Sequence, residues 1–108
     1  IFVKDLLSDQ TVRVSTSLSG GDGNGESINA RVSADGDYVV FQSTATNLST
    51  GDTNGYSDIF LWEAATGTLT NLTEDLAAVS NPNNGSFRPD VAYNGDANAI
   101  VVFQTARN

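Results

Sequence analysis

An internal repeat constrains the fold of this chain more than any other feature of its sequence. The segment IFVKDLLSDQTVRVS, which begins at Ile1, aligns without gaps with IFLWEAATGTLTNLT, which begins at Ile59. The segment NGESINARVSADGDYVVFQST, which begins at Asn24, aligns with NGSFRPDVAYNGDANAIVVFQT, which begins at Asn84. The offset is 58 residues for the first pair, from position 1 to position 59, and between 59 and 62 residues for the second. The small insertions fall at turns, as expected for repeated strands.

One repeat contains four stretches typical of β-strands, each bounded by turn residues. The first is followed by Asp35-Gly36, a pair that suits a two-residue hairpin turn. The second, YVVFQST, is apolar at consecutive positions, which predicts burial on both faces. The fourth, LTNLT, alternates and should turn one face to solvent. The stretches are residues 30–33, 38–44, 58–64 and 69–73. Four short antiparallel strands per repeat predict an all-β fold built from four-stranded β-propeller blades.

The composition excludes several classes of site. The 108 residues contain no Cys, His or Met, so the commonest general base and the commonest zinc ligands are missing. The formal net charge of -8, without any cluster of Lys or Arg, makes nucleic acid and anionic membranes poor partners. No apolar run reaches the roughly 18 to 20 residues of a membrane span, so we expect no membrane insertion.

Three segments together resemble a known family. VSADGDYVVFQSTATNL, GDTNGYSDIFLWE and TGTLTNLT are similar to the WD-like β-propeller repeats of the TolB type, which occur in exported bacterial proteins. The resemblance covers nearly the whole chain, and the Ser-Ala-Asp-Gly turn before an aromatic-rich strand is its most specific part. Ala30 departs from the pattern, since these repeats usually have Pro there, as at Pro89. The resemblance implies an extracellular or periplasmic location and a noncatalytic role as a protein-binding or scaffold module.

The phase of the repeat divides residues 1–108 into about two blade equivalents of a partial propeller. Residues 1–15 match the two outer strands of one blade, residues 30–73 a full blade, and residues 87–108 the inner strands of a third. A propeller needs roughly four to eight blades. Open strand edges invite pairing with another strand. We therefore expect either further blades of the same propeller or a homo-oligomer that closes a ring through the open edges.

One loop carries the oxygen ligands that calcium prefers. In GDTNGYSDIF, Asp52, Asn54 and Asp58 surround Gly55 at spacings that partly match calcium-binding loops. The bidentate Glu of an EF-hand is missing, and no flanking helices are predicted. The alternative is a β-turn in which Asp and Asn cap backbone groups while Gly takes positive φ. The sequence leaves both interpretations open, and calcium is its one candidate cofactor.

Catalysis is not expected, because no acidic or hydroxyl residue stands out from the repeat. The alternative function is a carbohydrate- or peptide-processing propeller domain, since a carboxylate pair can hydrolyse glycosides and fold does not fix function. The loop GGDGNGES at residues 20–27 lacks the Gly-Lys-Ser/Thr ending of a phosphate-binding loop and is interpreted as structural. Trp62, on an apolar strand, is interpreted as packing in the core or between blades, and a sugar-stacking surface shared with Tyr56 is the alternative.

Overall fold

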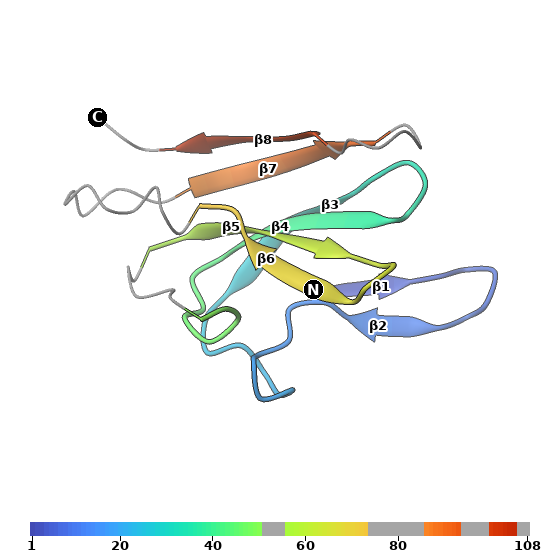
Figure 1. Cartoon of the computed structure of the whole chain (residues 1–108), viewed down its shortest axis with the longest axis horizontal. Coiled ribbons are helices and arrows are strands. Elements are labelled where there is room, and N and C mark those ends of the chain that lie inside the picture. Colours follow the sequence, from blue (N-terminus) through green and yellow to red (C-terminus); the bar gives the residue numbers. More distant parts are fainter. Residues whose placement is uncertain (51–55, 74–85, 94–99, 106–108) are drawn as a thin grey trace.

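The computed structural model describes residues 1–50, 56–73, 86–93 and 100–105, and within them every regular element is a β-strand. The strands are β1 (Phe2–Lys4), β2 (Thr11–Arg13), β3 (Ser27–Val32), β4 (Tyr38–Ser43), β5 (Asp58–Glu63), β6 (Thr68–Asn71), β7 (Ser86–Ala92) and β8 (Ile100–Thr105). They form three antiparallel sheets (Figure 1). The prediction of an all-β fold is therefore confirmed. Among the described residues, no helix has the length and apolar character needed to cross a membrane.

The central sheet contains four strands in the order β3-β4-β5-β6, so each strand pairs with the next along the chain. β4 pairs with β5 over their full length, from Tyr38 opposite Glu63 to Ser43 opposite Asp58. These four strands are the ones that the sequence pattern predicts for one repeat. β3 begins at Ser27, three residues earlier than expected.

The two-stranded sheet β1-β2 repeats the half of the central sheet that β5 and β6 form, which we call its outer half. Phe2 lies opposite Arg13 between β1 and β2. The residues 58 positions later, Phe60 and Asn71, lie opposite each other between β5 and β6. A backbone hydrogen bond next to each of these pairs is also repeated. The Val14 amide donates to the Ile1 carbonyl at 3.0 Å, and the Leu72 amide donates to the Ile59 carbonyl at 2.8 Å. The ungapped alignment of these segments thus holds for the backbone pairing.

The sheet β7-β8 repeats the half of the central sheet that β3 and β4 form, which we call its inner half. The repetition includes a shift in the register of the strands. Arg31 lies opposite Val40 between β3 and β4, and Asp90 lies opposite Val102 between β7 and β8. In each sheet the register shifts just before this pair, at Asn29-Ala30 in β3 and at the corresponding dipeptide in β7. Both inner strands therefore carry a β-bulge at the same repeat position.

The central sheet is covered on both faces by the two half sheets, which gives three layers (Figure 1). On one face, Phe41 and Phe60 stack with ring centroids 5.6 Å apart in a cluster that Ile1, Val3 and Trp62 also join. On the other face β7 lies against β3, β4 and β5. The prediction that 38–44 is covered on both faces is confirmed over β4, where five of six residues are buried. Trp62 packs between sheets, as expected.

Candidate functional site

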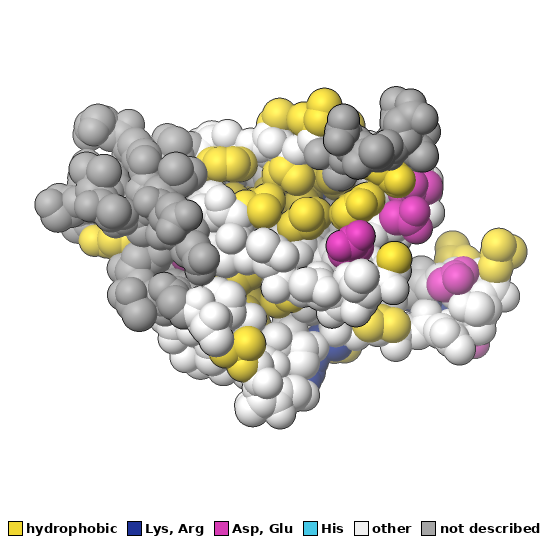
Figure 2. All heavy atoms as spheres, viewed as in Figure 1, with side chains coloured by type: hydrophobic (Ala, Val, Ile, Leu, Met, Phe, Trp, Pro, Cys, Tyr) yellow, Lys and Arg dark blue, Asp and Glu magenta, His cyan; other side chains and the backbone are white. Residues whose placement is uncertain are grey.

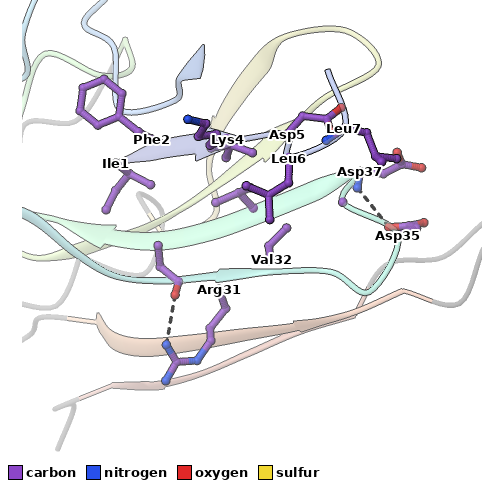
Figure 3. Close-up of a pocket in the computed structure, with 14 residues that line it drawn as sticks. Ile1, Phe2, Lys4, Asp5, Leu6, Leu7, Arg31, Val32, Asp35 and Asp37 are labelled. Atoms are coloured by element: carbon purple, nitrogen blue, oxygen red, sulfur yellow. Dashed lines mark hydrogen bonds between the residues drawn. The ribbon is translucent and has the colours of Figure 1, made fainter. Parts of the chain in front are cut away.

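A groove with a volume of about 720 Å³ runs between β1 with the turn that follows it and β3 with the β3-β4 connection (Figure 3). Its walls are residues 1–7 on one side and residues 30–32, 35–37 and Val39 on the other. Two apolar side chains at its rim are open to solvent, with 86% of Leu6 and all of Leu7 exposed. The groove therefore presents apolar surface that nothing in the described part of the chain covers.

A tight turn after β1 holds the rim of the groove in place. The Asp5 carboxylate accepts backbone hydrogen bonds from Leu7 at 2.8 Å and Ser8 at 3.3 Å. These two bonds stabilise the charged carboxylate and lower the pKa of Asp5. Lys4 and Asp9 form an exposed ion pair across the same turn at 3.1 Å. Leu6 points from this turn toward the opposite wall of the groove (Figure 3).

The opposite wall includes the connection between β3 and β4. The sequence predicts a two-residue hairpin turn at Asp35-Gly36, but here only Gly36 has positive φ, at 81°. The connection is longer because the Ser33 hydroxyl accepts a hydrogen bond from the Tyr38 amide and donates one to Asp35 at 2.7 Å. Desolvation raises the pKa of Asp35, but the hydrogen bonds from Ser33 and from the Asp37 amide outweigh it, so the pKa is lowered.

The edge of β1 that borders the groove lacks a strand partner among the described residues, because β1 pairs with β2 alone. The amide of Asp5 and the carbonyl of Ile1 bond toward β2 and its flanks. Since successive residues direct their backbone groups to opposite sides, Phe2 and Lys4 turn theirs toward the groove. This edge can therefore bind an extended chain through backbone hydrogen bonds.

β8 forms the second open edge, since its one described partner is β7. Ile100 is 63% exposed and Val102 is 60% exposed. Figure 2 shows hydrophobic side chains gathered over the β7-β8 sheet. By the repeat, β8 corresponds to β4 and β1 corresponds to β5, and in the central sheet these two strands pair. The open edges of β8 and β1 thus correspond to the two edges that pair with each other, as β4 and β5, within the central sheet.

The predicted calcium ligands fall partly outside the described residues, because Asp52 and Asn54 are not among them. Asp58 lies at the start of β5 and is 2% exposed. Its two carboxylate oxygens accept hydrogen bonds from the Thr73 hydroxyl at 2.7 Å and from the side-chain carboxamide of Asn71 at 3.3 Å. In the part of the chain that the structure describes, no three acidic, His or Cys side chains gather as a metal site would need. Calcium binding at Asp52, Asn54 and Asp58 stays a prediction.

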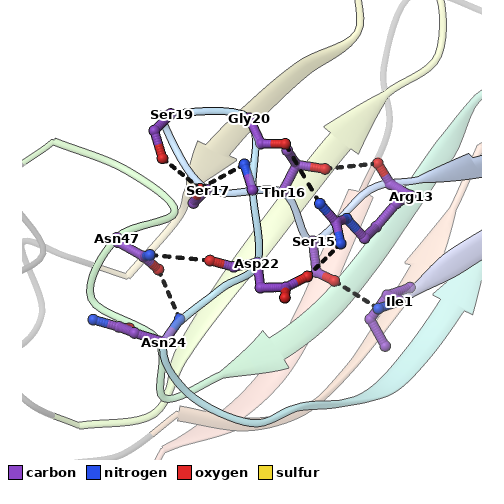
Figure 4. Close-up of polar contacts among 11 residues, drawn as sticks. Ile1, Arg13, Ser15, Thr16, Ser17, Ser19, Gly20, Asp22, Asn24 and Asn47 are labelled. Carbon is purple, nitrogen blue, oxygen red and sulfur yellow. Dashed lines mark hydrogen bonds and ion pairs between the residues drawn. The ribbon is translucent and has the colours of Figure 1, made fainter.

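The glycine-rich loop at 20–27 is tied to the segment after β4 (Figure 4). The Asn24 amide donates to the Asn47 side chain at 2.9 Å, and the Asn24 carboxamide exchanges two hydrogen bonds with Thr46. Asp22 forms an ion pair with Arg13 of β2. These contacts connect the outer half sheet to the central sheet, in agreement with the interpretation of this loop as structural.

Comparison of the chain with protein-family models, characterised proteins and solved structures finds no significant match. The function of the chain is therefore inferred from its open strand edges and the groove beside β1. Sequence reasoning missed three residues that shape the inner strands. Gln42 accepts hydrogen bonds from Asn29 in the bulge of β3 and from Arg88 in the bulge of β7. A signal was present: Gln42 is a polar residue directly after the apolar run of its strand, and the repeat places Gln104 at the corresponding position.

Proposed function

We propose that this chain is a segment of a β-propeller and serves as a noncatalytic protein-binding or scaffold module of an exported bacterial protein. The observation that carries the proposal is the stack of three sheets, in which the half sheets repeat the outer and inner halves of the central sheet in register. Successive blades of a propeller pack face to face in this way. Export and an extracellular or periplasmic location follow from the TolB-type resemblance.

Binding would occur by strand addition at the groove beside β1. A strand with the pattern of β8 would meet β1 as β4 meets β5, which places Phe103 opposite Phe2, because Phe41 lies opposite Phe60 in the central sheet. Such pairing derives its affinity from backbone hydrogen bonds and its specificity from alternate side chains. The incoming strand would come from a further blade of the same propeller, from a second copy of the chain or from a protein partner.

Light scattering after size-exclusion chromatography tests the proposal with one matched pair of variants. Proline at position 2 removes the backbone donor that faces the groove but leaves the hydrogen bonds to β2 intact, and Pro is tolerated on an open edge. The wild-type chain should associate, and Phe2→Pro should weaken association more than Phe2→Ala, which removes the side chain alone. A stable, dispersed 11.3 kDa monomer with a sharp thermal transition would contradict the proposal.

A further inference from the structure

A small pocket lies between β3 and β7, where the bulges of two adjacent layers meet. It has a volume of about 290 Å³ and is lined by Asn29, Arg31, Arg88, Pro89 and Asp90. The repeat equates the dipeptide Asn29-Ala30 with Arg88-Pro89, so the pocket is formed by the same feature of two successive repeats. The Arg31 side chain leaves β3 on the side of the β7-β8 sheet (Figure 3).

One buried side chain holds both bulges in an unfavourable backbone conformation. Asn29 has φ of 56° and Arg88 has φ of 52°, the left-handed region that residues other than glycine rarely adopt. The Gln42 side-chain oxygen accepts hydrogen bonds from the Asn29 carboxamide at 2.7 Å and from the Arg88 backbone amide at 2.9 Å. Backbone strain that is held by surrounding structure is a recurrent property of binding sites.

The charges in this pocket differ from those of the rest of the chain. Of the four basic residues that the structure describes, those in β1 and β2 form ion pairs with Asp9 and Asp22. The other two are Arg31 and Arg88, and neither forms an ion pair within the described residues. The Arg31 guanidinium donates to the neighbouring Ala30 carbonyl at 3.1 Å. In a chain of net charge -8, the two described arginines that form no ion pair thus line one pocket.

We propose that this pocket binds a carboxylate. The planar guanidinium fork matches a carboxylate with two parallel hydrogen bonds, and both arginines belong to the lining of this pocket. A volume near the lower end of small-molecule sites, about 300 Å³, suits a compact acid or a single carboxylate of a peptide. Asp90 also lines the pocket, where its charge opposes an incoming carboxylate, and its Oδ1 accepts a hydrogen bond from the Val91 amide at 2.8 Å. The proposal stands whether or not the chain is part of a propeller.

An NMR titration of the full chain with succinate at constant ionic strength tests this proposal. We expect saturable shifts of the backbone amides of Asn29, Arg31, Arg88 and Asp90. Each of Arg31→Gln and Arg88→Gln should weaken binding by about tenfold or more, because each removes charge-assisted hydrogen bonds. Asp90→Asn should strengthen binding, and Arg13→Gln, a paired arginine outside the pocket, should leave it unchanged. The amide spectrum of each variant verifies its fold.

A second arm distinguishes the source of the carboxylate. A short acetylated peptide with a free C-terminus is compared with its C-terminal amide, and neutral succinamide serves as the control for succinate. Saturable binding of the free-carboxylate peptide, but not of its amide, supports a peptide ligand; binding of succinate alone supports a small acid. No saturable shift with either, equal affinity for phosphate, or affinity unchanged in both Gln variants would overturn the assignment.

Discussion

Gln42 shows how one buried side chain can connect two layers. It is 7% exposed, and its Oε1 accepts hydrogen bonds from a residue of its own sheet and from the backbone of β7, 46 residues away. Burying a polar side chain costs free energy unless it forms hydrogen bonds, so Gln42 can be buried here only because Asn29 and Arg88 donate to it. The β7 layer is thus positioned by a specific contact as well as by apolar packing.

Replacing Gln42 should destabilise the chain more than replacing an exposed glutamine. Gln42→Leu leaves two donors without their acceptor, at a cost of about 1 to 3 kcal/mol in the free energy of unfolding. Urea denaturation measures the loss, with exposed Gln10→Leu as the matched control. Equal stability of the two variants would show that the interlayer bonds contribute nothing.

Gly25 is required by close packing. A Cβ atom at this position would lie 2.6 Å from the backbone nitrogen of Ala45 and 2.7 Å from the carbonyl carbon of Thr44. Gly25→Ala should therefore lower the free energy of unfolding by about 1 to 3 kcal/mol, as overpacking does. Gly21→Ala is the control, because its nearest contact would be the Ser17 hydroxyl at 3.7 Å. Similar melting temperatures for both variants would contradict this expectation.

At the scale of elements, the connection between β3 and β4 makes stability depend on pH. The pKa of Asp35 is lowered from 3.8 in the folded chain, so its contribution is present above pH 3.8 and is lost as pH falls through the folded pKa. Asp35→Asn should therefore reduce the loss of stability on acidification from pH 5 to about pH 3. Thermal melts at the two pH values measure the loss of stability of each variant, with exposed Glu26→Gln as the control. An unchanged acid sensitivity of Asp35→Asn would rule out this contribution.

The strands could be predicted because their signals are local, whereas the bulges and the surroundings of Asp58 could not. Apolar runs and turn residues mark β4 and β5 directly in the sequence. Arg88 gives no local sign of left-handed backbone, and Asn29 gives only a weak one, because Asn adopts this conformation more often than other non-glycine residues. The acceptor that holds both residues lies on another strand. Likewise, a loop pattern suggests Asp58 as a ligand but does not reveal that Thr73, 15 residues later, donates to its carboxylate.

On the scale of the whole molecule, the open edge of β1 and the fully paired strand β4 should differ in hydrogen exchange. The amides of Phe2 and Lys4 should exchange rapidly in dilute solution and slow as chain concentration rises, because pairing at the groove would cover them. Val40, fully buried in a strand paired on both sides, should be protected at every concentration. Mass spectrometry or NMR exchange over a concentration series measures this. An exchange rate of the Phe2 amide that does not change with chain concentration would argue against association through this edge.

The repeated register of the sheets also bears on how such a chain can change in evolution. Each two-stranded sheet repeats the strand pairing of one half of the central sheet, at an offset of 58 to 62 residues. Duplication or loss of one such unit in the gene would therefore add or remove a whole layer while the remaining layers kept their contacts.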